Sequence, residues 1–236
     1  CYQDPDCGRL SLSNLFFMSS QFNYFTQNNT RVKGVLHVGA HRGEEIYDYE
    51  SMGAEKVIWV EPVPELFEEM ETFLTKAQCS ITSHAYEYAA SNTDHKTVDF
   101  NLYFGPDARY MSGNKGCSSL LKTSGRFESW SKGTIQVETI TLDTLLSEND
   151  FSAADFQYLN MDVQGAELLV LQGSENLLNH VQYVATEATW DNPDYIDNTD
   201  YSELKTLLES KGFVETEIKP HADNWGDALF VKENNG

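Results

Sequence analysis

The sequence predicts an α/β fold in which a mostly parallel sheet carries helices on both faces. The apolar run from Val35 to Val38 leads into a turn with Gly39 and Gly43, and strand-like runs alternate with helix-like runs after it. A strand, a glycine turn and a helix in this order build nucleotide pockets in α/β proteins. Glycines let the backbone approach the ligand, and the helix N-terminus offers free N–H groups.

The composition is that of one globular domain with a strongly acidic surface. The 236 residues carry 37 Asp and Glu against 16 Lys and Arg, which gives a formal net charge of −21. This balance leaves no basic stripe to replace the counterions of phosphates, so we expect no nucleic-acid partner. It also disfavours an anionic membrane surface, and no run of about 18 apolar residues predicts a transmembrane helix. We therefore expect a cytoplasmic protein without a membrane partner.

The N-terminal part is expected to be a helical segment, residues 1–33, packed on a main domain of residues 34–236. Its apolar side chains cluster between Leu10 and Thr26. The four cysteines show no metal spacing, and reduced thiols are the expected state in a cytosolic protein. Because the chain starts at Cys1 rather than Met, we expect a trimmed chain or one domain of a longer polypeptide.

The segments that follow the glycine turn have clear helix and strand signals. A helix over residues 44–52 is ended by Gly53, which suits the position after a helix. Residues 56–60 form a second apolar strand. Residues 64–74 place apolar side chains at a period near 3.6 with acids opposite, which predicts an amphipathic helix, and a third strand is expected over residues 81–90.

The middle of the chain holds two more strands and a long loop. Residues 98–104 alternate apolar and polar side chains, which indicates a half-exposed strand. The loop at 105–118 is glycine-rich, and loops of this length in a compact domain are often functional. A strand is expected over residues 135–141, followed by a short helix capped by Asp143.

The last third of the chain again alternates strands and helices. Apolar runs of strand length indicate the strands, and a glycine after each of two helical segments indicates where those helices end. The expected elements are strand 156–161, helix 165–172, strand 181–185, helix 201–211, and strands 213–218 and 228–232.

Acidic side chains follow three of the expected strands. Glu61 lies 22 residues after Gly39, where an acid can accept both ribose hydroxyls of an adenosyl cofactor. Asp162 and Glu187 each follow a buried strand. Because the carboxyl ends of parallel strands face one crevice, we expect these groups along one edge. Asp162 could instead cap the next helix, and Glu187 could be a structural acceptor.

The chain resembles the FkbM family of S-adenosylmethionine-dependent methyltransferases. The matching pieces run in family order and are residues 35–43, 60–62, 117–120, 140–146 and 160–167. The last piece is the most specific, with the usual form Lys-Ile-Asp-Val-Glu-Gly-Ala-Glu. In this chain Asn160 replaces the lysine and Gln164 the first glutamate, whereas Asp162, Gly165 and Glu167 match. His37 stands where methyltransferases commonly have an acid.

The resemblance implies a Rossmann-like class I methyltransferase fold with a seven-stranded, mostly parallel sheet and an antiparallel last strand. It implies S-adenosyl-L-methionine as cofactor and O-methylation, often of a sugar hydroxyl in glycans or natural products. The expected cofactor-binding residues are Gly39, Ala40, His41, Gly43, Glu61, Pro62, Ala90, Ser91 and Asp162.

Methyl transfer to a hydroxyl needs a base, because an alcohol is a poor nucleophile. Asp162 and Glu187 are the expected catalytic residues. A divalent metal held by these carboxylates could replace the base, but no third ligand is fixed, so we favour a metal-free site. Ser118 and Ser119 are expected in the acceptor site, where Trp190 offers an apolar face to a sugar ring.

Two alternatives to a methyltransferase remain open. An NAD-dependent oxidoreductase shares the fold, but His41 occupies the place of the second motif glycine, and we expect no catalytic Tyr-x-x-x-Lys pattern. A non-catalytic module that binds an adenosyl group or a glycan would keep the same pocket without turnover. In each case the expected partner is a small molecule or a glycan.

Overall fold

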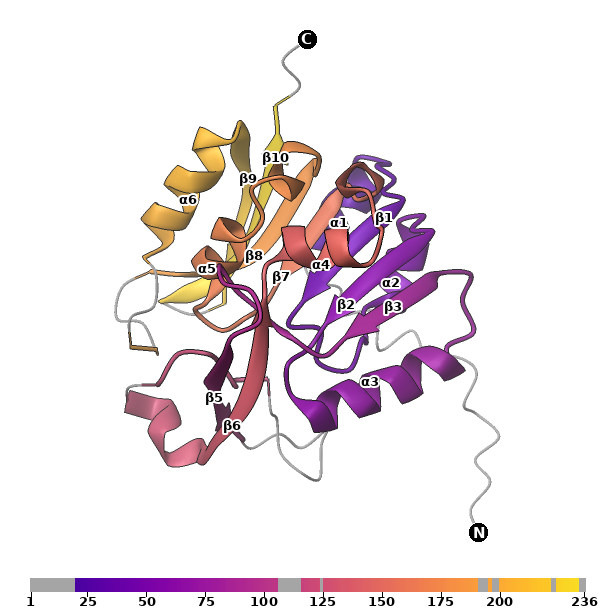
Figure 1. Cartoon of the computed structure of the whole chain (residues 1–236). Coiled ribbons are helices and arrows are strands. Elements are labelled where there is room, and N and C mark those ends of the chain that lie inside the picture. The colour runs from indigo at the N-terminus through magenta and orange to yellow at the C-terminus, as the bar shows by residue number, and fades with distance from the viewer. Residues whose placement is uncertain are drawn as a thin grey trace.

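In this computed structural model a seven-stranded sheet lies between two layers of helices, with a three-stranded sheet beside it (Figure 1). The structure describes residues 20–105, 116–123, 125–190, 195–196, 200–221 and 224–233. Most of the apolar cluster between Leu10 and Thr26, in the expected N-terminal helical segment, therefore lies outside the described residues.

The observed elements follow the alternation expected from the sequence. The helices are α1 (Ser20–Gln27), α2 (Ile46–Ser51), α3 (Pro64–Lys76), α4 (Leu142–Glu148), α5 (Glu167–Gln172) and α6 (Tyr201–Ser210), with 3₁₀ turns η2 (Gly125–Trp130), η3 (Ala153–Asp155) and η4 (Leu177–Asn179). The strands are β1 (Gly34–Val38), β2 (Lys56–Val60), β3 (Thr82–Tyr86), β4 (Ala89–Ala90), β5 (Thr97–Tyr103), β6 (Ser131–Ile140), β7 (Tyr158–Met161), β8 (Tyr183–Thr189), β9 (Phe213–Pro220) and β10 (Trp225–Lys232).

The main sheet has the strand order β3-β2-β1-β7-β8-β10-β9. Strands β3, β2, β1, β7 and β8 pair in parallel, and β10 is antiparallel to both of its neighbours. The expected sheet with an antiparallel last strand is thus confirmed. The order reverses between β1 and β7, and such a switch point opens a crevice at the carboxyl ends of the strands.

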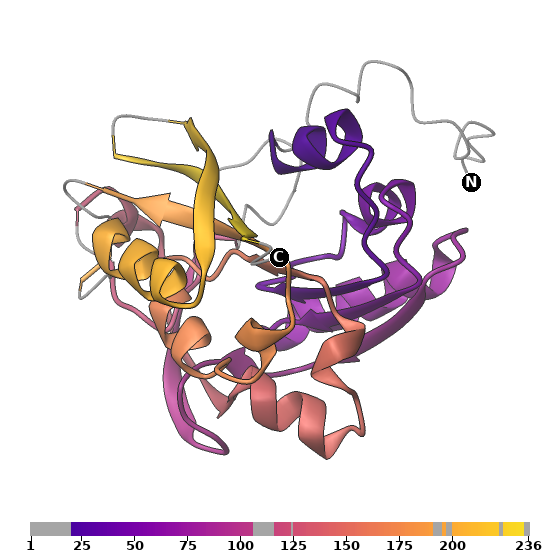
Figure 2. The same cartoon turned by 90° about the horizontal axis from the view of Figure 1, so that it is seen from above.

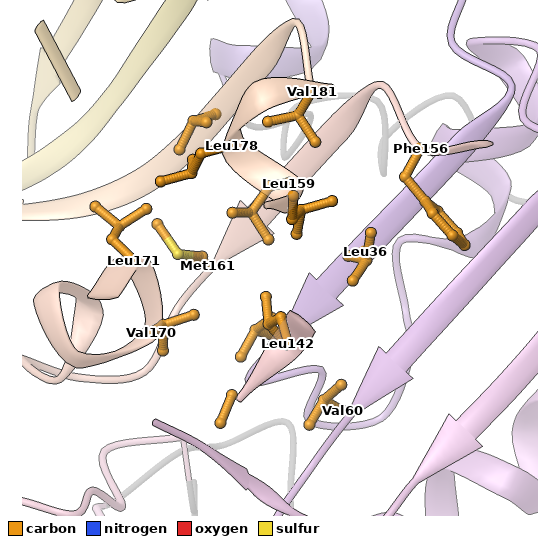
Figure 3. Packing of buried hydrophobic residues seen from close by; sticks show 14 of the residues in the cluster. Leu36, Val60, Leu142, Phe156, Leu159, Met161, Val170, Leu171, Leu178 and Val181 are labelled. Atoms are coloured by element: carbon orange, nitrogen blue, oxygen red, sulfur yellow. The ribbon is translucent and has the colours of Figure 1, made fainter. Parts of the chain in front are cut away.

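Both faces of the central strands are buried, which explains their almost uninterrupted apolar runs. On one face Leu36 and Leu159 pack with residues of α4 and α5, a cluster shown in Figure 3. On the other face Val35 and Trp59 pack with residues of α1, α2 and α3. Seen from above, α1 and α4 lie on opposite sides of the sheet (Figure 2).

Helix α1 is attached to the sheet by aromatic side chains, of which Phe25 is the most deeply buried. Phe25 is 1% exposed, and its ring centroid lies 5.0 Å from that of Tyr158 and 4.9 Å from that of Tyr183. Aromatic pairs at this separation contribute about 0.5–1.5 kcal/mol beyond the burial of their area. Every helix in the described ranges falls short of the length and apolar content needed to cross a bilayer.

Two local expectations are wrong. The strand expected over residues 81–90 is divided, because β3 pairs with β2 whereas β4 pairs with β6 in the small sheet. Asp143 does not cap α4. The N-cap is Thr141, whose hydroxyl accepts from the Thr144 N–H at 3.1 Å. The Asp143 carboxylate instead accepts the backbone N–H groups of the η4 turn, at 2.7 and 2.9 Å.

Candidate active site

The turn after β1 needs a glycine for two reasons. Gly39 has φ of 76°, and a Cβ atom there would lie 1.8 Å from the backbone oxygen of Asp162. The N–H groups of Gly39 and Ala40 both donate to the Val60 carbonyl, at 2.9 and 3.1 Å. Strands β1, β2 and β7 can therefore approach one another at their carboxyl ends only because this side chain is missing.

We expect Gly39→Ala to lower the free energy of unfolding more than Gly212→Ala does. Gly212 also has a positive φ, of 85°, but its Cβ would meet no atom within 4 Å. Gly212→Ala should therefore cost only the left-handed strain of about 1–2 kcal/mol. Gly39→Ala should add roughly 1–3 kcal/mol or more from steric overlap with the backbone. Urea unfolding of both variants measures the difference, and equal losses would contradict the close approach at Gly39.

A cavity of about 510 Å³ opens at the carboxyl ends of the strands. This volume is in the range of small-molecule and cofactor sites. Nine of the residues expected from the sequence line it, namely Gly39, Ala40, His41, Glu61, Pro62, Ala90, Ser118, Asp162 and Glu187. The topology thus brings together side chains that lie up to 148 residues apart in the chain.

Glu61 is buried at the end of β2 and holds the glycine turn. Its carboxylate accepts the His41 N–H and the Val63 N–H, both at 2.9 Å. Burial raises the pKa of Glu61 to about 7, against the lowering effect of the two backbone donors. Each carboxylate oxygen keeps a further lone pair, so the group can still accept hydroxyls from the cavity.

Asp162 and Glu187 form the floor of the cavity as a coupled pair. Glu187 lies inside β8 rather than after it, but still in the carboxyl-terminal half of that strand. The two carboxyl groups hydrogen-bond to each other, and burial raises the pKa of both. Asp162 is exposed to the solvent of the open cavity, so its pKa is raised less than that of the half-buried Glu187. Because the charge of Asp162 also disfavours ionisation of Glu187, Glu187 is the weaker acid of the pair, and we assign the first proton taken up by the pair to it.

The side chain of Gln164 bridges these two carboxyl groups. Its amide nitrogen donates to Asp162 Oδ1 and to Glu187 Oε2, both at 2.6 Å. The Tyr195 hydroxyl lies 2.9 Å from the amide oxygen and 2.7 Å from the Cys117 carbonyl oxygen, and these two acceptors share its single proton. Asp162 does not cap α5, because the N-cap residue of that helix is Ala166.

Four of the expected site residues do not line the cavity in the described part of the chain. Gly43 packs beneath the turn, near Leu74, and Ser91 joins β4 to the end of β6. Ser119 is completely buried, and its hydroxyl donates to the Gln164 carbonyl at 2.8 Å. Trp190 packs on the hydrophobic core and against the ring of Tyr201, at 6.3 Å.

His37 is a core histidine, as expected, although it also reaches the cavity wall. It is 4% exposed, and its Nδ1 lies 3.0 Å from the Tyr49 hydroxyl. Asn160 donates to the same hydroxyl at 2.8 Å. Burial lowers the pKa of His37 to about 3, so the ring is neutral at physiological pH. Two of the three positions that depart from the family pattern, His37 and Asn160, are therefore linked through Tyr49.

The cavity is also lined by three carboxylates that sequence analysis did not place in the site, Glu44, Glu45 and Asp227. Asp227 of β10 lines the cavity opposite Glu187, and its Oδ2 lies 2.8 Å from His221 Nε2. Trp225 of the same strand also lines the cavity. The only available signal was the alternation of Trp225 and Asp227 at the start of a strand, and that signal does not indicate which face points to the site.

Comparison with known proteins identifies the fold. A family model described as "Methyltransferase FkbM domain" matches residues 37–215. The magnesium protoporphyrin IX methyltransferase of Synechocystis PCC 6803, solved with bound SAM, is 8% identical, with a TM-score of 0.50 over 91% of this chain and 77% of that chain. The putative tRNA (m1A22) methyltransferase Sp1610 of Streptococcus pneumoniae is 10% identical, with a TM-score of 0.50 over 93% and 73%.

A third structure gives the same result. TrmK of M. capricolum, solved with S-adenosyl-homocysteine, is 8% identical, with a TM-score of 0.50 over 92% of this chain and 69% of that chain. At such identities the likeness concerns the fold alone, which is that of Rossmann-like class I methyltransferases. No curated protein sequence matches the chain.

Proposed function

The chain belongs to the FkbM methyltransferase family, and we propose that it transfers a methyl group from S-adenosyl-L-methionine to a sugar hydroxyl of a glycan or glycosylated natural product. The observation that carries this proposal is the Asp162–Glu187 pair on the cavity floor, beside the glycine turn. A hydroxyl acceptor must lose its proton, and a paired carboxylate facing the cavity can accept it.

The residues around the glycine turn fit an adenosyl cofactor. The turn presents backbone without a side chain at Gly39, and Glu61 lies buried at the end of β2, where its carboxylate can accept ribose hydroxyls. Ala90 adds an apolar wall nearby. When bound, S-adenosyl-L-methionine supplies an electrophilic methyl group. The protein's part is to hold the acceptor oxygen toward that group and to remove its proton.

Asp162 is the proposed base, and Gln164 positions it. With the first proton of the pair on Glu187, Asp162 is ionised and can accept the proton of the acceptor hydroxyl. The amide of Gln164 contacts both carboxyl groups and fixes their spacing. Other titratable groups near the pair are Asp227 on β10, Glu167 on α5, Glu45, Tyr195 and His41.

We expect Gln164→Glu to move the acidic limb of the kcat profile to higher pH. The substitution restores the glutamate that is usual in the family and adds a third carboxyl group against the pair. Like charges raise one another's pKa, so the base should ionise about one pH unit higher, or more. The rate near neutral pH should fall and recover at higher pH.

Gln172→Glu is the matched control for this prediction. It adds the same charge at an exposed position whose side chain contacts Asn92. Its pH profile should coincide with that of the wild type. If both variants had the wild-type profile, Gln164 would not control the ionisation of the base.

Methyl transfer from deuterated S-adenosyl-L-methionine to a panel of methyl glycosides tests the proposed function. Mass spectrometry of the products should show a labelled O-methyl group on at least one sugar. Labelled product only from amines or carboxylic acids in a parallel panel would overturn the sugar assignment. Binding of S-adenosylhomocysteine by calorimetry with no labelled product from any panel would favour the non-catalytic binding module.

We also propose that nucleic acid is not the acceptor, although one structural neighbour is named as a putative tRNA methyltransferase. A nucleic acid gains affinity when basic side chains of a protein displace the counterions of its phosphates. A chain of net charge −21 would instead repel it. An NAD-dependent oxidoreductase is disfavoured by family membership. The Tyr-x-x-x-Lys pattern from Tyr201 to Lys205 lies on α6, where both side chains contact Glu215 rather than the cavity.

A further inference from the structure

We infer that Trp225 and Asp227 of β10 form the acceptor-binding wall of the cavity, where a neutral sugar ring stacks on the indole and donates hydroxyls to the carboxylate. This inference rests on the proposed function and names the surface that would recognise the sugar. It replaces Trp190, the aromatic residue expected from the sequence, by one that lines the cavity.

The register of the sheet places this wall beside the proposed base. In the antiparallel pairing of β10 with β8, Trp225 lies opposite Thr189 and Asp227 lies opposite Glu187. Every second residue of a strand points to the same face, so these four side chains share one face. All four line the cavity. An acceptor held by Trp225 and Asp227 would therefore lie next to the Asp162–Glu187 pair.

One histidine braces both members of the wall. His221 Nε2 lies 2.8 Å from Asp227 Oδ2, and the His221 ring lies 4.8 Å from the Trp225 ring, centroid to centroid, with the planes 41° apart. The Asp227 side chain is 22% exposed and that of His221 is 30% exposed. Contact with both residues fixes the carboxylate relative to the indole before any ligand arrives, which reduces the ordering cost of binding.

The chemistry of the wall favours a neutral, hydroxyl-rich ligand. An indole face covers apolar C–H surface, while a carboxylate is an acceptor only and suits donor hydroxyls. Among the residues that the structure describes, no lysine or arginine lines the cavity. An acceptor bearing phosphate or carboxylate at this wall would be repelled by the negative charges of Asp227 and the nearby Asp162.

The test measures acceptor KM, kcat and S-adenosylhomocysteine affinity with the best methyl glycoside of the panel. Trp225→Ala should raise KM about tenfold or more, because the apolar contact is lost. Trp225→Phe, which keeps an aromatic face, should raise it less. In both variants kcat and the S-adenosylhomocysteine Kd should stay within about twofold of the wild type, since a contact made equally in the ground and transition states changes KM alone. Retained S-adenosylhomocysteine binding also shows that the variants fold.

A second arm tests the carboxylate with deoxy glycosides. Asp227→Asn should raise the KM of the full glycoside about tenfold, and a glycoside that lacks the contacted hydroxyl should lose no further affinity in this variant. Tyr47→Ala is the control, because Tyr47 is an exposed aromatic residue that packs on Phe73 rather than in the cavity. Its kinetic constants should match those of the wild type.

The possible outcomes separate this inference from the proposed function. Absence of sugar methylation in the wild type defeats the proposed function before any variant is made. Sugar methylation with an unchanged KM in Trp225→Ala and Asp227→Asn overturns only the acceptor wall. A KM for 2-amino-2-deoxy glycosides well below that of the matched neutral glycosides would also overturn it, because the wall would then recognise a cation. A lower KM for uronic acids than for neutral sugars would contradict it as well.

Discussion

Replacing Asp162 with asparagine is expected to lower kcat by about 10²–10⁴, the usual contribution of a general base. In the wild type the Gln164 amide donates to Asp162 Oδ1 at 2.6 Å. Asparagine keeps the size of the side chain and one oxygen that can accept this hydrogen bond. It removes only the charge and the ability to accept a proton. The fold should persist, because the helix that follows begins after Ala166 and does not depend on Asp162 for its cap.

Three measurements separate the possible roles of Asp162. Calorimetry with S-adenosylhomocysteine should give nearly the wild-type Kd, and urea unfolding should give nearly the wild-type free energy. Activity within a few-fold of the wild type would remove Asp162 as the base. If chelator abolished wild-type activity and Mg²⁺ or Mn²⁺ restored it, the carboxylate would be acting through a metal ion instead.

The second large effect is expected at Glu61. Glu61→Ala should weaken binding of S-adenosylhomocysteine by roughly 2–4 kcal/mol, because about two hydrogen bonds to a charged group are lost and water compensates in part. This is about a 30- to 1000-fold change in Kd. The alanine also leaves the N–H groups of His41 and Val63 without their present acceptor, so the free energy of unfolding should fall as well.

Glu61→Gln separates these two effects. The glutamine keeps one oxygen acceptor but carries no charge, so affinity should fall while stability changes less than in Glu61→Ala. An unchanged Kd in both variants would remove Glu61 as the ribose-binding acid. Gln172→Glu, at an exposed position, serves again as a control for a change of one charge.

The pH dependence at Glu61 has a defined sign. Burial raises its pKa to about 7, so the folded protein holds this proton more tightly than the unfolded chain does. This group therefore lowers the stability of the fold as the pH rises from the unfolded value of about 4.3 through 7. The ionised carboxylate is the stronger acceptor, so wild-type affinity for S-adenosylhomocysteine should rise between about pH 6 and pH 8. In Glu61→Gln this rise should disappear.

The sequence alone was sufficient to predict the fold and to place the glycine turn, Glu61 and Asp162 at one cavity. Buried parallel strands require continuous apolar runs, and such runs are visible at β1, β2 and β7 without any tertiary information. A glycine is needed where backbones cross closely, which made the turn at Gly39 visible as well. Because parallel strands end at one edge, the acids Glu61 and Asp162 could be placed together from their positions in the chain.

The tertiary structure was needed to place the residues of the proposed acceptor wall. Trp190 and Trp225 are indistinguishable as aromatic residues next to a strand, and the pairing of β10 with β8 places Trp225 in the cavity while Trp190 packs on the core. Asp227 comes into the site through the same antiparallel pairing, 40 residues after Glu187. A shift of register by one residue would turn both side chains to the other face, and the sequence does not specify register.

The coupling within the site also depends on the folded state. Gln164 contacts Asp162 and Glu187 because the loop after β7 passes beside β8, with Gln164 in a left-handed conformation at φ of 55°. The sequence determined that carboxylates lie at or near the carboxyl ends of these strands. Their spacing, the order in which they take up protons and the bracing of Asp227 by His221 arise from burial and from contacts between distant segments, and only the folded chain brings those segments together.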